Sequence, residues 1–172
     1  MIIESFKAIC VATGEKVGYP VNYIFGESAY IREQLSVLSK SRETALKKFP
    51  LIGLYSPFVE RKDSRDYYCK TSVDLIIAVN TLEKYTNEQR LEVSFKGVLR
   101  PLYEAFIEEV ENYKRFDFDD HVSHNYSENF VFGRRGAYDS LGNELSEKID
   151  AIEIKNLELT VKKEKCYGKR IF

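Results

Sequence analysis

The stretch from Phe49 to Asn80 constrains the fold more than any other part of the sequence. It holds two apolar runs rich in β-branched and aromatic residues, Phe49–Phe58 and Tyr67–Val79, joined by a charged connector, Glu60–Asp66. Runs of this length and composition around a turn-like link predict two adjacent antiparallel strands. The second run alternates at first and is then apolar on both sides over Leu75–Val79, which is typical of a strand covered on both faces. We therefore expect it at the centre of the sheet.

The first quarter of the chain is expected to form a β-hairpin and then a helix. Two β-like runs, 2–12 and 17–25, predict the hairpin, and Pro20 favours an edge strand or an extended arm. Residues 27–47 carry apolar side chains at helical spacing and predict an amphipathic helix. Serines lower the helix propensity in its middle, so a break is expected near residue 40.

Residues 86–113 carry the clearest helical pattern in the chain. One continuous apolar face runs along this segment, and glutamates cover the opposite side. Thr86 and Gln89, three positions apart, predict a capping box at the start. Gly97 and Pro101 interrupt the pattern and predict a kink. The expected role of the helix is to cover one face of the sheet.

The last third of the chain divides into a loop, a strand and a tail. Residues 114–148 lack sustained periodicity and predict a long irregular loop with a short strand at Asn129–Phe132. Residues 149–162 predict a strand in which the buried parity changes at Lys155-Asn156, as a β-bulge would produce. Residues 163–172 form a basic tail.

These elements predict an α+β fold in residues 1–172, read as a single domain. A mainly antiparallel sheet is flanked by two helices, with a hairpin arm at 1–25, a core at 27–162 and the basic tail. A chain of 172 residues can bury an ordinary core. Its 26 Lys and Arg against 27 Asp and Glu give a net charge of −1, which provides no global attraction to nucleic acid and little self-repulsion.

Cysteine usage and hydropathy bear on the compartment. The three cysteines are far apart and form no CxxC pair, which favours a reducing cytosol, with Cys69 expected as a small buried apolar residue. The first residues lack the apolar core of a signal peptide, and no apolar run approaches the ~18 residues of a membrane span. We expect a soluble protein with no membrane partner.

The segment Asp117–His124 is the only cluster with metal-ligand residue types. It contains both histidines, His121 and His124, beside aspartates, a combination that would suit Zn or Mn. The competing interpretation is a solvated acidic loop or an interface. No nucleophile with a base can be assembled from sequence motifs, so we predict no catalytic residue, no cofactor and no enzymatic activity.

Arginine and lysine residues occur in two segments whose sequence predicts a turn. Arg61, Lys62 and Arg65 belong to the charged connector, and Arg134 and Arg135 lie between two glycines. The glycine spacing does not match a phosphate-binding loop. Three interpretations of these arginine and lysine residues stay open: exposure to solvent without a partner, contact with a protein partner, or contact with nucleic acid.

Several segments together resemble a known class of small phage proteins. They are Phe49–Tyr55 followed by Ser56–Phe58, the strand Val73–Ala78, the helix start Tyr85–Arg90 and the strand Ile149–Ile154. The chain is similar over residues 27–162 to tail-terminator and tail-completion proteins of the head–tail junction in tailed phages and prophages of Bacteroidetes.

The resemblance implies a structural protein of the virion tail or neck that assembles as an oligomeric ring. Its partners would be other copies of the chain, other tail or neck proteins and non-specific DNA in the lumen. The candidate contacts are then Arg61, Lys62, Arg65, Arg134 and Arg135, and extended segments would reach neighbouring subunits. The alternatives are a metal-dependent enzyme at the Asp117–His124 cluster and a small nucleic-acid-binding accessory protein.

Overall fold

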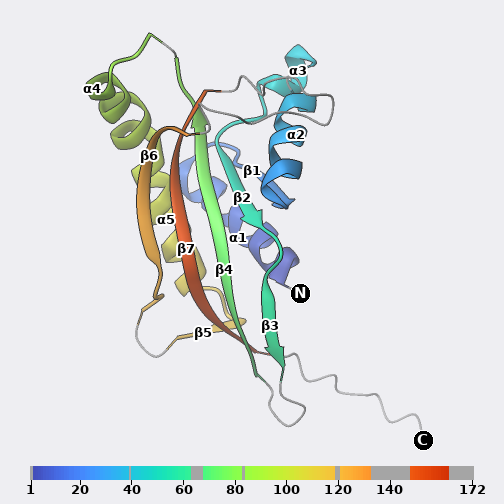
Figure 1. Cartoon of the computed structure of the whole chain (residues 1–172). Coiled ribbons are helices and arrows are strands. Elements are labelled where there is room, and N and C mark those ends of the chain that lie inside the picture. The colour runs from blue at the N-terminus through green and yellow to red at the C-terminus, as the bar shows by residue number, and fades with distance from the viewer. Residues whose placement is uncertain are drawn as a thin grey trace, which may run out of the picture.

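The stretch at Phe49–Asn80 lies in the middle of a mixed α/β structure whose curled sheet is mostly antiparallel (Figure 1). The computed structural model describes residues 2–38, 40–62, 68–82, 84–118, 121–132 and 148–162. The predicted α+β class is confirmed within these residues.

The strands of the described residues form one seven-stranded sheet with the order β1-β2-β4-β7-β5, in which β3 also pairs with β4 and β6 with β7. Only β1 and β2 are parallel to each other. The bounds are β1 Asn22–Gly26, β2 Leu51–Tyr55, β3 Val59–Lys62, β4 Tyr68–Asn80, β5 Phe116–Asp117, β6 Asn125–Phe132 and β7 Ile149–Lys162. The two predicted adjacent strands are confirmed as β2 and β4, which pair antiparallel. The first part of the predicted connector, Glu60–Lys62, is not a loop but belongs to β3, which pairs with the distal part of β4.

Helical segments cover both faces of this sheet. Their bounds are α1 Ile2–Val17, α2 Ser28–Leu38, α3 Arg42–Ala45, α4 Asn87–Arg90, a π-helical segment Leu91–Leu99 and α5 Arg100–Glu111. We call the sheet face packed on α1 and α5 the inner face, and the face packed on α2 the outer face (Figure 1).

The apolar centre of β4 is covered on both sides, as its sequence predicts. Leu75 and Ile77 point to the inner face and belong to the main core with Phe6, Phe95 and Phe106. The alternate side chains point to the outer face, where they meet α2. This smaller cluster consists of Ile31, Leu35, Leu51, Ile76, Ala78, Ile149 and Ala151. The second cover is therefore the helix within 27–47, and no neighbouring subunit is needed for it.

The expected N-terminal hairpin at 1–25 is wrong for most of its length. Residues 2–17 form α1, which packs in the main core rather than extending as an arm. Its buried residues recur at helical spacing; they are Ile2, Ser5, Phe6, Ile9, Cys10, Thr13 and Gly14. Only 22–26 is a strand, and it lies at the edge of the sheet, consistent with Pro20 just before it. The sheet is thus flanked by α1 as well as by the two predicted helices.

The second predicted helix, 86–113, is confirmed, and its start is fixed by side-chain contacts. Thr86 and Gln89 form the predicted capping box. A π-helical segment, Leu91–Leu99, lies within this helix and ends just before Pro101. The kink expected at Gly97–Pro101 stays a prediction. The break expected near residue 40 also occurs, between α2 and α3.

The described part of the segment 114–148 contains more strand than its sequence predicts. β5 and β6 both lie in it, and β6 begins at Asn125 rather than Asn129. The predicted bulge in β7 is confirmed: the register with β4 shifts between Val73 and Leu75, and Asn156 has a φ of 53°. The predicted tail 163–172 lies outside the described residues.

Candidate interaction surface

The curled sheet has one large area that the described helices leave open. β4 and β7 are 13 and 14 residues long, well above the ~5–6 residues of an ordinary strand, and α2 packs only on the end near Ile76 and Ala78. Toward the other end, the side chains of the outer face are polar and mostly exposed. We call this area the distal sheet face; it consists of Val59, Arg61, Lys70, Ser72, Glu158 and Thr160.

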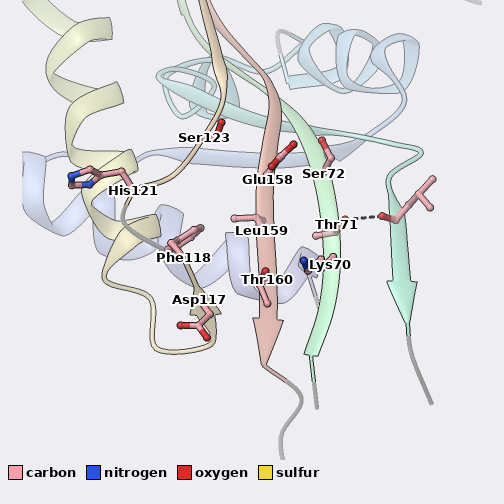
Figure 2. A pocket seen from close by; sticks show the side chains of 11 residues that line it. Lys70, Thr71, Ser72, Asp117, Phe118, His121, Ser123, Glu158, Leu159 and Thr160 are labelled. Carbon is pink, nitrogen blue, oxygen red and sulfur yellow. Dashed lines mark hydrogen bonds between the residues drawn. The ribbon is translucent and has the colours of Figure 1, made fainter. Parts of the chain in front are cut away.

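The distal sheet face forms the floor of a hollow of about 450 Å³ (Figure 2). Lys70 and Ser72 from β4 and Glu158 and Thr160 from β7 lie on its floor, and Val59 of β3 borders one side. The segment after β5 borders the other side through Asp117, Phe118, His121 and Ser123. The backbone N–H of Glu158 donates to the carbonyl oxygen of Ser123 at 3.1 Å and holds this segment against β7.

Two cations are neighbours on the distal sheet face. Arg61 of β3 lies directly opposite Lys70 of β4, so both point to the outer face, and both are exposed. Nearby, Lys162 Nζ lies 3.2 Å from Asp117 Oδ1 and forms an ion pair. Directly opposed like charges destabilise a strand pair unless a counter-charge lies between them.

The remaining residues of the predicted contact set are placed only in part. Lys62 is the last residue of β3, and its side chain lies outside the described residues, as do Arg65, Arg134 and Arg135. Of that set, the structure therefore places the side chain of Arg61 and brings it together with Lys70, which the sequence analysis did not select.

The two histidines of the Asp117–His124 cluster contact different partners. His124 Nδ1 lies 3.2 Å from the carbonyl oxygen of Val122, which can only accept, so Nδ1 carries the proton and Nε2 accepts from the Tyr103 hydroxyl at 2.7 Å. His121 Nδ1 lies 3.4 Å from Glu111 Oε1 and the side chain is 86% exposed. Neither contact is the Ser–His or Cys–His pair of nucleophilic catalysis.

The described members of this cluster do not form a metal site. In the part of the chain that the structure describes, no group of three or more His, Cys, Asp and Glu side chains is placed to hold a metal ion. Asp119 and Asp120 lie outside that part. Asp117 is paired with Lys162, away from the imidazole that contacts Tyr103.

A polar network on the edge strand β6 was not anticipated from the sequence. The Arg100 guanidinium donates to Glu128 through Nε at 2.7 Å and Nη2 at 3.1 Å, a two-pronged bond between α5 and β6. This bond holds the pKa of Glu128 below its usual range, and burial raises the pKa of the adjacent Tyr126. The alternation of Tyr126, Glu128 and Phe130 on one strand face was the available signal.

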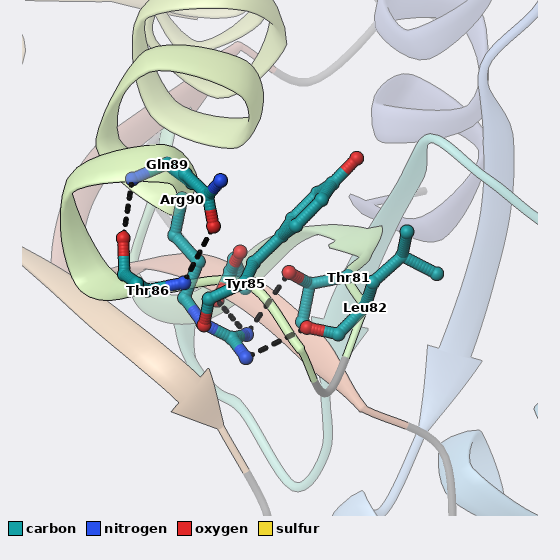
Figure 3. Close-up of polar contacts among 7 residues, drawn as sticks. Thr81, Leu82, Tyr85, Thr86, Gln89 and Arg90 are labelled. Atoms are coloured by element: carbon teal, nitrogen blue, oxygen red, sulfur yellow. Dashed lines mark hydrogen bonds and ion pairs between the residues drawn. The ribbon is translucent and has the colours of Figure 1, made fainter.

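Arg90 forms a second unanticipated network at the start of the long helix (Figure 3). Its guanidinium donates to the Leu82 and Tyr85 carbonyl oxygens at 2.8 and 3.1 Å, and to Thr81 Oγ1 at 2.9 Å. It also lies 3.4 Å from Asp150 Oδ1 of β7, and both side chains are almost fully buried. The network anchors the connection after β4 and has no opening to the distal sheet face.

No protein-family model and no curated protein matches the sequence. Within the described residues, no helix has the length and apolar character needed to cross a membrane.

Proposed function

We propose that the chain is a structural assembly subunit of the tail or neck of a tailed phage, and that it forms an oligomeric ring at the head–tail interface. The observation that carries the proposal is the asymmetric cover of the sheet. The inner-facing side chains of β4 and β7 are buried, whereas the outer face is covered by α2 at one end only.

Because of this asymmetry, the residues that stabilise the fold differ from those that are available to contact another molecule. The main core is complete without the distal sheet face, since Cys69, Val73, Leu157 and Val161 are buried on the inner side of the same strands. The side chains that alternate with them on the outer side are polar and available to another molecule. A ring subunit needs such a combination of a self-sufficient core and an exposed, mainly polar contact area.

The charge balance also suits self-association. A net charge of −1 imposes little repulsion between copies, and the cations of the distal end can meet either a protein partner or DNA in the lumen. In this proposal Arg61, Lys62, Arg65, Arg134 and Arg135 are the contact residues, without a base-specific role.

Light scattering after size-exclusion chromatography, followed by negative-stain imaging, tests the ring. We expect a discrete oligomer and closed rings, alone or with the tail-tube protein encoded nearby. A protein that stays monomeric at every concentration and with those partners would refute the proposal. The flanking genes give an independent check, because the proposal requires capsid, portal or tail-tube genes beside this one.

A further inference from the structure

A second charged surface lies on α5, the helix that packs on the inner face of the sheet, whereas the distal sheet face belongs to the outer face. Glu104, Glu108 and Glu111 of α5 follow each other at i, i+4 and i+7, so they form one stripe along the helix. All three are exposed, on the side of α5 that faces away from the sheet. We call this stripe the acidic helix face.

The acidic helix face retains negative charge after its internal contacts are counted. Lys16 of α1 pairs with Glu108 and with the neighbouring Glu109. Glu111 lies beside His121 and accepts from the backbone N–H of Val122 at 3.3 Å. Two carboxylates, those of Glu108 and Glu109, thus share one lysine, and the stripe presents an excess of negative charge to solvent.

We propose that the acidic helix face of one copy covers the β3–β4 part of the distal sheet face of the next copy, with its carboxylates between Arg61 and Lys70. This contact rests on the proposed ring and names the surfaces that build it. Because the two surfaces differ, the contact is head-to-tail, and it forms a ring when the rotation between successive copies closes.

The acidic helix face is long enough to extend over the cations of the distal sheet face. From Glu104 to Glu111 it rises about 11 Å at ~1.5 Å per residue. The β4 residues of the distal sheet face, Lys70 and Ser72, are about 7 Å apart along the strand at ~3.3 Å per residue. A neighbour's helix would therefore supply, at the distal end, the outer layer that α2 supplies at the other end.

The other charges of the distal sheet face favour a helix over nucleic acid. Glu158 lies on the same face next to Ser72, and Asp117 borders the hollow. A continuous phosphate backbone crossing the hollow would meet these carboxylates. A single helix can instead lie over β3 and β4, where Arg61 and Lys70 are, with the Glu158 side of the hollow left free.

A paired charge reversal tests the contact. One variant carries Arg61→Glu and Lys70→Glu, and the other carries Glu104→Lys and Glu108→Lys. Each variant alone should associate at least about tenfold more weakly than the unchanged chain, because like charges then face each other. Their equimolar mixture should reassemble, since each reversed surface meets a matching surface on the other variant.

The matched control is Lys84→Glu, an exposed lysine before α4 and outside both surfaces, which should assemble normally. Circular dichroism and thermal unfolding establish that every variant is folded. Association of the unchanged chain should also weaken when salt shortens the Debye length from about 10 Å at 0.1 M to about 3 Å at 1 M.

The outcomes separate this contact from the proposed function. If the unchanged chain forms rings and both reversal variants still do, the contact is refuted and the ring stands. If each variant dissociates but the mixture does not reassemble, the pairing of these two surfaces is refuted. If assembly is unaffected and only retention of a short DNA duplex is lost with Arg61→Glu and Lys70→Glu, the surface binds nucleic acid instead. A monomeric unchanged chain refutes both proposals.

Discussion

Replacing Arg90 by Met should destabilise the protein more than any surface substitution. The arginine side chain is 4% exposed and that of Asp150 is 0% exposed. Methionine preserves the apolar stem of the side chain but removes the buried cation beside the carboxylate. Breaking a buried ion pair in this way costs about 3–5 kcal/mol, mainly because the remaining charge stays desolvated.

The hydrogen bonds of Arg90 add to this cost and place it near the middle of that range. Three further acceptors, on Thr81, Leu82 and Tyr85, lose their donor, at about 1 kcal/mol each when counted separately. These losses are not additive with the ion pair, so we expect about 4 kcal/mol in total. For a chain of this size that corresponds to a fall in Tm of about 8–16 °C.

Urea unfolding followed by far-ultraviolet circular dichroism measures this cost. The matched control is Lys96→Met on the same long helix, whose exposed pair with Glu92 should change the free energy of unfolding by no more than about 0.5 kcal/mol. Asp150→Asn and the double variant complete a thermodynamic cycle, in which the double should cost at least about 1 kcal/mol less than the sum. A cost below about 1 kcal/mol for Arg90→Met, or strict additivity, would refute the assigned role.

Three further substitutions or treatments have defined outcomes. Gly53→Ala should lower the free energy of unfolding in urea by about 1–3 kcal/mol, because the new Cβ would lie 2.9 Å from a methyl group of the buried Ile76 under α2. An unchanged free energy of unfolding would contradict the close packing there. Glu128→Gln should cost about 1 kcal/mol above pH 4.5, the ordinary pKa of the group. Because the folded state has the lower pKa, this cost should shrink as the pH falls from 4.5 through the folded value, and an unchanged difference in acid would contradict the role of the carboxylate. In a Cys166→Ser variant, Cys10 and Cys69 should react with a thiol reagent only when the protein unfolds, because both are buried and burial raises the pKa of the Cys10 thiol. Rapid labelling of the native protein would contradict the burial of these thiols.

The sheet centre could be predicted because its signals are local. Continuous apolar character over Leu75–Val79, the capping box at Thr86 and the parity change at Lys155-Asn156 each depend on a few neighbouring residues. All three were confirmed. Each expresses a physical requirement that the surrounding fold does not override: two-sided burial, satisfied helix-end N–H groups and an inserted strand residue.

The N-terminal helix was missed because two periodicities compete there. β-branched residues are frequent in the first 17 positions, and the odd-numbered run from Val17 to Phe25 extends a strand-like pattern into them. The helical stripe through Ile2, Phe6 and Ile9 is equally present and is the one that meets the core. Tertiary packing decided between them, which a propensity argument cannot do.

The side chains of the candidate surface could not be grouped from sequence, because register brings them together. Arg61 was selected from the charged connector, but its neighbour Lys70 lies nine positions away and is opposite only in the observed pairing of β3 with β4. The same holds for Arg100 and Glu128, which are 28 positions apart. A pair that forms across strands has no local signature unless the register is already known.

The bulge in β7 explains why one strand can serve both the core and the exposed surface. Lys155 and Asn156 together lie opposite Asp74, whose carboxylate accepts from the Asn156 backbone N–H at 2.8 Å and holds the bulge in place. In a regular strand, Ile154 and Leu157 would point to opposite faces, because they are three positions apart. The extra residue changes the parity, so both point into the core. Bulges also increase local twist, which curls the distal half of the sheet. The cover by α2 at Ile76 and Ala78 therefore ends close to the bulge opposite Asp74. The longest strand of the Phe49–Asn80 stretch, β4, thus contributes both to the core and to the surface that we propose for assembly.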